Sequence, residues 1–347
     1  MTIPGVTKRI TDDIWELRKI ILDMKTGGRV LVESLLAHGV EVVFGIPGNH
    51  NLAIYEHLNA AGIKHVLARH EQGCVFAADG YARVTGKPGV ALVTGGPAVL
   101  NCLAALSQSY ADSIPVLLVS PGMPLRHPQR GNGLLHETKD QHAAVDAIVA
   151  ISHRVTSVPE VGEAVMQAFV DMTSGRPRPV HVEVPFDVLE ESALVNIGLP
   201  IRTAISVAPE DQIVVAARTL AFAQSPGIVV GGGARHAAPE VLQLAERLGA
   251  AVVSSTNGKG ILPEDHPLSL GAGAHLPAIA EWVRSRDVVI AVGTDLGEAD
   301  LWNGPWQFVG ELIRIDIDPR QIVINAKPDL SLVGDAAATL DSLIRVL

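Results

Sequence analysis

The feature of this 347-residue sequence that most limits its fold is the alternation of short apolar segments with helical patterns. Helices are expected over residues 27–38, 52–60, 72–85 and 98–110. The segments between them are short and almost wholly apolar, as in strands covered on both faces, and they comprise residues 42–44, 66–68, 90–93 and 116–120. Strands that alternate with helices in this way predict βαβ units and a parallel sheet.

A second alternating set follows residue 208, with strands expected at 227–230, 251–254, 287–292 and 312–317 and helices at 239–248 and 278–284. The chain length favours two domains, and 48% hydrophobic residues are enough for two cores. We therefore predict an α/β chain of two doubly wound parallel-sheet domains, residues 26–190 and 209–347, joined by a linker over residues 191–208.

Residues 1–25 form an N-terminal extension ahead of these domains. Apolar side chains recur there at helical spacing, at Ile10, Ile14, Leu17, Ile21 and Met24. This spacing predicts an amphipathic helix. Such a helix either packs on its own domain or docks another chain.

Charge and composition exclude several classes of function. The net charge is −10 and Lys and Arg do not cluster, so we expect no nucleic-acid partner. The apolar runs are strand-length and the start of the chain has no apolar signal-peptide region, so we expect neither a membrane span nor a leader. The two cysteines, Cys74 and Cys102, lack metal-ligand spacing, which predicts no metal site, no disulfide framework and a cytoplasmic location.

Four turns rich in glycine and proline follow the carboxyl ends of expected strands. They read GIPGNHN (45–51), ARHEQG (68–73), TGGPAVLN (94–101) and SPGMP (120–124). Ligands of open parallel sheets bind outside these strand ends, and glycine lets a backbone approach them closely. Each turn alone also fits an ordinary strand-to-helix connection. No such turn carries the G-x-G-x-x-G pattern, which argues against a dinucleotide-dependent dehydrogenase.

Taken in order, these motifs resemble thiamine-diphosphate (ThDP) dependent enzymes of the acetolactate synthase and 2-oxo acid decarboxylase family. The run RHEQG and the FAADGYARVTGKPGVALVTGGP segment near it, with FGIPGNHNL and GRPRPVHVEVPFDVL, resemble the pyrimidine-binding domain of that family. The strings PGIVVGGGA and LIRIDIDPRQI resemble its central, Rossmann-like domain. The resemblance covers nearly everything from residue 27 to residue 347.

The resemblance gives Glu71 the cofactor-activating role. In the family this glutamate bonds the far ring nitrogen of the aminopyrimidine and favours the imino tautomer that accepts the thiazolium proton. The role requires a protonated carboxyl group, and an apolar pocket raises the pKa of a carboxyl group. The apolar residues after it, Cys74, Val75 and Phe76, fit such a pocket. On the local sequence alone, Glu71 is better explained as an acidic residue at a helix N-terminus.

The same resemblance implies further cofactor contacts. Pro47, Gly48 and Asn49 belong to the first loop, and TGGPAVLN resembles a family turn near the pyrimidine. Gly95, Gly96 and Asn101 are therefore expected to shape the pyrimidine pocket. Ala98 replaces a family glycine, and alanine does not readily adopt a positive φ, so the fit to the cofactor is in doubt there.

Substrate-facing residues are expected among Asn49, His50, His136 and Gln141. His50 and His136 are candidates for handling substrate protons because imidazole titrates near neutral pH. Residues 131–145 lie where acetolactate synthases place a Gln-Glu pair, and here the pair is His136-Glu137. This stretch leans toward the branch that contains guanidino-oxopentanoate decarboxylase. The alternative is that these are solvent-exposed histidines without a function, as is usual for a single histidine in a loop.

The resemblance also bears on FAD and Mg²⁺, two further ligands of the family. The segment GTDLGEADLW (293–302) lacks the Arg-Phe-Asp pattern of FAD-binding members, which argues against FAD. Family members hold the diphosphate through Mg²⁺ on a third domain with a Gly-Asp-Gly motif, and we expect that C-terminal diphosphate-binding domain to be absent from this chain.

The expected function follows from these points. The chain is expected to be the pyrimidine-side subunit or a fragment of a ThDP-dependent lyase or transferase, a decarboxylase or carboligase of 2-oxo acids. A partner chain would supply the diphosphate-binding domain, in a homo- or hetero-oligomer. The alternatives are a subunit of a 2-hydroxyacyl-CoA lyase acting on an acyl substrate, and a non-catalytic relic that binds a partner or regulates.

Overall fold

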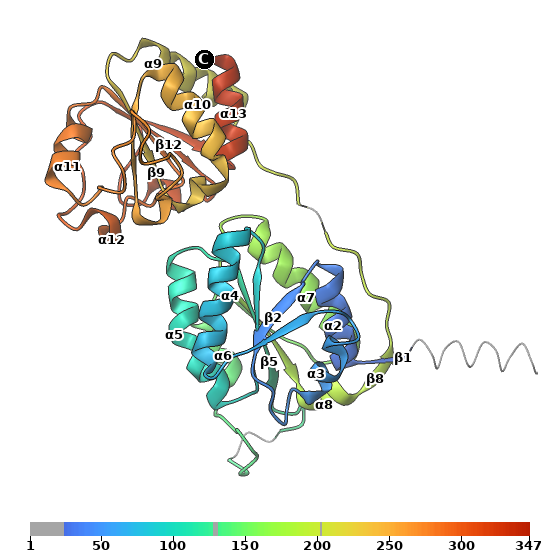
Figure 1. The fold of residues 1–347 in the computed structure, drawn as a ribbon. Coiled ribbons are helices and arrows are strands. Elements are labelled where there is room, and N and C mark those ends of the chain that lie inside the picture. Colours follow the sequence, from blue (N-terminus) through green and yellow to red (C-terminus); the bar gives the residue numbers. More distant parts are fainter. Residues whose placement is uncertain (1–23, 128–130, 202) are drawn as a thin grey trace, which may run out of the picture. The chain divides into compact units, whose positions relative to one another are not determined.

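The computed structural model describes residues 24–127, 131–201 and 203–347, and its contacts divide the chain into two compact units (Figure 1). The first unit ends at residue 203 and the second begins at residue 204. The amphipathic helix predicted for residues 10–24 lies outside the described residues except for Met24, which belongs to a short strand. No helix of the described residues has the length and apolar character needed to cross a membrane.

The first unit is built around a six-stranded sheet in which every pair of neighbouring strands is parallel. The strand order is β3-β2-β4-β5-β7-β6. The strands are β2 (Val42–Gly45), β3 (Lys64–Leu67), β4 (Gly89–Leu92), β5 (Val116–Gly122), β6 (Ile151–Arg154) and β7 (Val180–Pro185). A separate antiparallel pair joins β1 (Met24–Thr26) to β8 (Ser192–Leu194).

Helices cover both faces of this sheet, as Figure 1 shows. One apolar core lies under α2 (Gly27–Ala37), α3 (Leu52–Leu58), α7 (Val158–Thr173) and α8 (Phe186–Glu190). The other lies under α4 (Glu71–Thr85), α5 (Pro97–Ala111) and α6 (Gln141–Asp146). Residues of β4, together with Val93 directly after it, contribute alternately to the two cores, Val90 and Leu92 on one face and Ala91 and Val93 on the other. This is why its sequence is apolar throughout.

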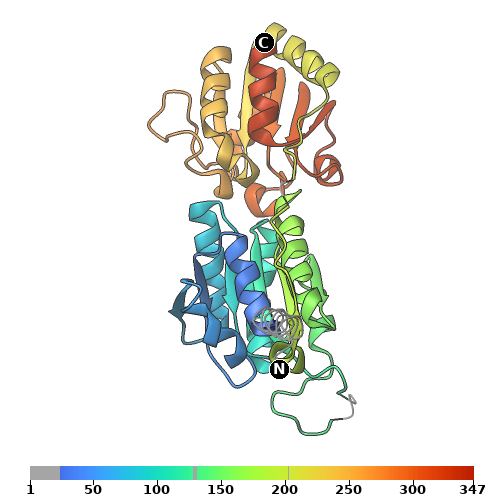
Figure 2. The same cartoon turned by 90° about the vertical axis from the view of Figure 1, so that its right-hand side faces the viewer.

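The second unit has a five-stranded parallel sheet of order β10-β9-β11-β12-β13. Its strands are β9 (Pro226–Val230), β10 (Ala251–Ser254), β11 (Val288–Val292), β12 (Glu311–Asp316) and β13 (Leu330–Val333). Its α-helices are α9 (Glu210–Phe222), α10 (Ala238–Leu248), α11 (Pro277–Arg284), α12 (Glu298–Leu301) and α13 (Ala336–Val346), with 3-10 turns η1 (Gly232–Ala237), η2 (Thr256–Gly258) and η3 (Gln321–Val323). The red helix α13 packs beside α10 (Figure 2).

The predicted fold class, α/β with two doubly wound parallel sheets, is confirmed. Several elements were not among the predicted ones, including α6, β6 and α7 in the first unit and α9, β13 and α13 in the second. The apolar residues of α13 include Ala336, Leu340, Leu343 and Ile344, which are buried in the core of the second unit. Their spacing of three and four residues is the helical signal that the sequence offered.

The triple glycine after β9 has a packing role. A Cβ atom on Gly231 would lie 2.3 Å from the carbonyl oxygen of Gly293, and a Cβ atom on Gly233 would lie 2.9 Å from the Cα atom of Gly293. The Gly233 amide also donates a hydrogen bond to the Gly293 carbonyl, at 3.0 Å. The glycines therefore let the loops after β9 and β11 pack backbone against backbone.

Candidate active site

The strand order of the first unit places a topological switch point between β2 and β4. From β2 the chain moves outward to β3 and then returns across β2 to β4, so the loops after β2 and β4 leave neighbouring strands in opposite directions. Open parallel sheets bind ligands in the crevice that this divergence leaves at the carboxyl ends. The loops concerned are residues 45–51 and 94–101, two of the four turns singled out in the sequence.

The first loop is held in shape by Asn51, a fully buried residue. Its Oδ1 accepts a hydrogen bond from the Gly48 amide at 2.7 Å, and its Nδ2 donates to the Ile46 carbonyl at 3.1 Å. Pro47 and Asn49 are exposed at the outside of the loop. Asn51 was not predicted as a site residue, although an asparagine directly before a helix is a known sign of a loop-fixing or capping side chain.

Gly48 lies against Thr94 of the opposite loop. A Cβ atom on Gly48 would lie 3.0–3.2 Å from the side-chain atoms of Thr94. Thr94 is 8% exposed, and its Oγ1 has no hydrogen-bond partner among the residues that the structure describes. Buried hydroxyl groups are normally paired, so this oxygen is suited to a ligand that enters the crevice.

Glu71 is the first residue of α4, which follows the edge strand β3. His70 is the N-cap of this helix, and its side chain accepts a hydrogen bond from the Gln72 amide. Glu71 is half-buried, and its Oε2 accepts a hydrogen bond from Asn101 Nδ2 at 2.9 Å. The structure thus brings together two predicted site residues that are 30 positions apart.

The thiols of Cys74 and Cys102 lie behind Glu71 and are fully buried. Burial, with the nearby charge of Glu71, raises the pKa of the Cys74 thiol to about 11, and burial raises that of Cys102 further. Both groups are therefore neutral near pH 7 and behave as small apolar side chains. They belong to the apolar core that lies under the first turn of α4.

The turn between β4 and α5 contains Gly95 and Gly96. Gly96 has φ 68°, and a Cβ atom on it would lie 2.3 Å from the His136 carbonyl oxygen. A Cβ atom on Gly95 would lie 2.9 Å from the Pro121 carbonyl oxygen. Ala98, where a disturbed fit to the cofactor was expected, is the second residue of α5 and does not adopt a positive φ, so its backbone is not strained. The left-handed conformation is confined to Gly96 within this turn.

His50, His136 and Phe186 form an aromatic cluster beside this turn. The His50 ring stacks on Phe186 with centroids 5.1 Å apart and meets His136 edge-on at 5.6 Å. Burial, with the neighbouring His136, lowers the pKa of His50, so its ring is neutral at pH 7. His136 Nδ1 is buried and has no hydrogen-bond partner within the described residues. Phe186 was not predicted as a site residue, because only the fold brings the start of α8 to this position.

Gln141 lies inside the domain, 8% exposed. Its Oε1 accepts a hydrogen bond from the Gly96 amide at 2.6 Å, and its Nε2 donates to the Pro121 carbonyl at 3.0 Å and to Glu183 Oε2 at 2.9 Å. The side chain that was expected to face substrate is therefore occupied by contacts within the domain. Among the described residues, no group of three or more His, Cys, Asp and Glu is arranged to hold a metal ion.

We expect His181, which is linked to Gln141 through Ser120, to make the stability of the first unit depend on pH. This residue is fully buried, and burial with the nearby His142 and His153 lowers its pKa from 6.5 to about 3. Below about pH 6.5 the unfolded chain binds a proton at His181, whereas the folded chain does not. Protonation therefore leaves the free energy of unfolding unchanged above that pH and lowers it as the pH falls toward 3. At about pH 4.5 the expected loss is about 2–3 kcal/mol.

Calorimetric melting of wild type and His181→Gln, each at about pH 7.5 and about pH 4.5, measures this contribution. We expect the wild-type unit to lose more stability than the variant between the two pH values. Equal losses in both proteins would show that His181 is not the titrating group.

Comparison with known proteins finds two sequence families along the chain. Residues 25–144 match the family described as thiamine pyrophosphate enzyme, N-terminal TPP binding domain, and residues 213–343 match the thiamine pyrophosphate enzyme, central domain. A probable 2-ketoarginine decarboxylase of Pseudomonas aeruginosa is 42% identical over 321 residues, which are 92% of this chain and 57% of that protein.

Acetolactate synthases are also among the similar proteins. One from Arthrospira platensis is 37% identical, with 92% of this chain and 58% of that protein covered. The chloroplastic enzyme of Arabidopsis thaliana is 32% identical, with 100% of this chain and 53% of that protein covered. The chain thus spans somewhat more than half the length of these relatives.

Proposed function

Because this chain belongs to the thiamine-diphosphate enzymes of the acetolactate synthase and 2-oxo acid decarboxylase family, as their N-terminal and central domains, we propose that it forms the pyrimidine side of a ThDP site. The observation that carries the proposal is the contact between Glu71 and Asn101 beside the switch point of the first sheet. A non-catalytic relic would have no need to keep this polar pair together.

The residues present fit an aminopyrimidine ring. Glu71 offers a carboxyl group that can hold a proton toward a ring nitrogen, and Asn101 orients it through Oε2. The Gly95-Gly96 turn packs closely against the His136 and Pro121 carbonyl oxygens, which gives it a defined shape, and the buried Thr94 hydroxyl is available to a ligand. Pro47, Gly48 and Asn49 border the crevice on its other side. When bound, ThDP supplies a carbanion that adds to a carbonyl and an electron sink for decarboxylation.

The other half of the cofactor needs partners outside this sequence. We propose that Mg²⁺ and the diphosphate are held by a diphosphate-binding domain, supplied by a partner chain or by further polypeptide of the same protein in an oligomer. The acidic balance of this chain, −10 overall, is consistent with a need for a metal ion to offset phosphate charge. The proposed location of the assembly is the cytoplasm, and no role for FAD is proposed.

The proposed reaction is decarboxylation of a 2-oxo acid, with or without a following carboligation. His50 and His136 lie on one side of the Gly96 turn, where their rings can exchange protons with a bound substrate. Asn49 is the neighbouring exposed polar group on the first loop. The relative named for 2-ketoarginine decarboxylation makes a 2-oxo acid with a guanidino group the first substrate to test. A 2-hydroxyacyl-CoA lyase activity is the alternative within the same chemistry.

The test of the proposed function uses the assembly that contains both halves of the cofactor site. CO₂ release from 2-ketoarginine and from pyruvate is measured with and without ThDP and Mg²⁺. ThDP-dependent release is the expected result. A well-folded assembly that binds ThDP but releases no CO₂ from either of these 2-oxo acids would contradict the proposal.

Replacing His50 by Gln is expected to lower kcat/KM for the 2-oxo acid about 100-fold, which is the lower end of the usual contribution of an acid or base. Because the pKa of His50 is lowered, the kcat/KM of the wild type should begin to decline only below pH 6.5. The variant has no imidazole at this position, so its kcat/KM should not show this decline. His266→Gln, a change in the second unit, is the control and should leave both quantities unchanged.

A further inference from the structure

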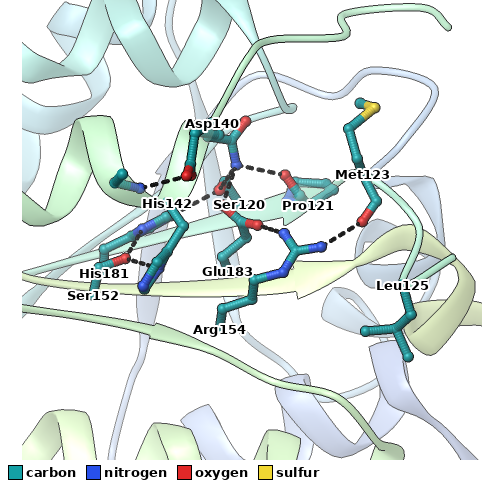
Figure 3. A network of polar contacts seen from close by, with 12 residues as sticks. Ser120, Pro121, Met123, Leu125, Asp140, His142, Ser152, Arg154, His181 and Glu183 are labelled. Atoms are coloured by element: carbon teal, nitrogen blue, oxygen red, sulfur yellow. Dashed lines mark hydrogen bonds and ion pairs between the residues drawn. The ribbon is translucent and has the colours of Figure 1, made fainter. Parts of the chain in front are cut away.

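A network of polar side chains, most of them buried, connects the Gly96 turn to the edge strand β6. Figure 3 shows the part of it around Ser120, His181, Glu183 and Arg154. It begins at Gln141 and continues through Ser120, His181 and Ser152 to His142, with successive polar atoms 2.8–3.2 Å apart. A second branch runs from Gln141 to Glu183 and from there to Arg154. Gln141 and His142 belong to α6, and the other members project from β5, β6 and β7. Val180, Val182 and Val184 of β7 pack into the opposite core.

Glu183 is the anchor of the second branch. It is fully buried, and its Oε1 pairs with Arg154 Nη1 while its Oε2 accepts a hydrogen bond from Gln141 Nε2. Arg154 Nη2 also donates to the Met123 carbonyl at 2.9 Å. A buried carboxylate is tolerated only with such partners. The space for the pair depends on Gly122, where a Cβ atom would lie 2.3 Å from Glu183 Oε1.

The carboxylate of Glu183 determines which way the Gln141 amide points. An ionised carboxylate and the Pro121 carbonyl can only accept hydrogen bonds, so both require the NH₂ group of Gln141. The Oε1 atom is then turned to the opposite side, where it accepts a hydrogen bond from the Gly96 amide. If the Gln141 amide were flipped, its NH₂ group would face the Gly96 N–H group and its oxygen would face the Glu183 carboxylate.

We propose that Gln141 is a positioning residue for the Gly96 turn between β4 and α5, and that the Arg154–Glu183 ion pair orients its side chain. Through Gly96 it fixes the backbone of the turn that carries Gly95, Thr94 and the start of α5 with Asn101. The inference rests on the proposed function, because the turn is assigned to the pyrimidine ring of ThDP. It replaces the expected contact between Gln141 and substrate.

Exchange of roles between positions 141 and 183 tests this orientation. Gln141→Glu sets two carboxylates together and should raise the KM for ThDP about tenfold, with a smaller effect on the KM for the 2-oxo acid. The double variant Gln141→Glu with Glu183→Gln restores a donor between the two positions and an acceptor for Gly96. It should recover most of the loss. Ser120→Ala, which leaves the Gly96 contact in place, is the matched control and should keep a near-normal KM for ThDP.

Amide hydrogen exchange in peptides spanning residues 92–100 provides a readout that needs no activity. Gln141→Leu and Gln141→Glu should exchange the Gly96 amide at least tenfold faster than wild type, and the double variant should return toward the wild-type rate. Unchanged exchange in Gln141→Leu, or a rise in the KM for the 2-oxo acid alone, would overturn the proposal. If the wild-type assembly shows no ThDP-dependent reaction, the proposed function fails, while the exchange rates still report whether Gln141 holds the turn.

Discussion

Replacing Glu71 by Gln is expected to lower kcat of the complete assembly by about 10²–10⁴-fold, the usual contribution of a group that transfers a proton in the reaction. A glutamine at this position can still accept the hydrogen bond from Asn101 but cannot exchange a proton with a ring nitrogen. The fold should be retained, because Glu71 is half-buried at the start of a helix that His70 already caps. Steady-state CO₂ release measures the effect.

Two controls make the Glu71 result specific. Glu163→Gln removes an exposed carboxyl group from α7 and should leave kcat unchanged. The Tm of Glu71→Gln should lie within about 2 °C of wild type, corresponding to less than about 1 kcal/mol. Normal turnover in Glu71→Gln would contradict the mechanism. A strongly lowered Tm would show instead that Glu71 mainly supports the helix N-terminus.

Replacing Gly96 by Ala should destabilise the first unit by about 2–4 kcal/mol, because the new Cβ meets a carbonyl group and the residue must keep a positive φ. The nearest atom is the His136 carbonyl oxygen, 2.3 Å from where the alanine Cβ would lie, and backbone atoms cannot move aside as a flexible side chain can. Relief of the clash moves the turn away from His136, so ThDP binding should weaken as well. Scanning calorimetry should show a Tm lower by about 5–10 °C for this unit.

Ala98→Gly is the matched control for this effect. It restores the glycine of the family motif two residues further on, at a helical position where no positive φ is required. Glycine within a helix costs up to about 1 kcal/mol relative to alanine. We expect a small loss of stability for Ala98→Gly and a large one for Gly96→Ala. The reverse order would show that the turn is formed differently.

The sequence was sufficient to predict the fold class and the edge of the sheet where the candidate site lies. Apolar strands, helical spacing and turns after strand ends are local signals, and they place Gly48, Glu71 and Gly96 after three strands of the first sheet. The resemblance named Glu71 and Asn101 together, and the structure brings their side chains into contact. Their roles in catalysis stay predictions.

Contacts that depend on the paths of loops could not be predicted. Phe186 meets His50, and Gln141 meets Gly96, only because distant segments return to the same strand ends. The alternation of polar and apolar residues in HVEVP was a local sign that His181 and Glu183 share one face of a strand. What it could not show is that this face is buried and that Gln141 lies against it.

The most direct test of the central claim is calorimetric titration of ThDP with Mg²⁺ into this chain, alone and together with the polypeptide that carries the diphosphate-binding domain. Saturable binding only in the combined sample is the predicted result, with weaker binding in Gly96→Ala. Absence of binding in the combined sample, with both parts folded and associated, would contradict the assignment of this crevice to the pyrimidine ring.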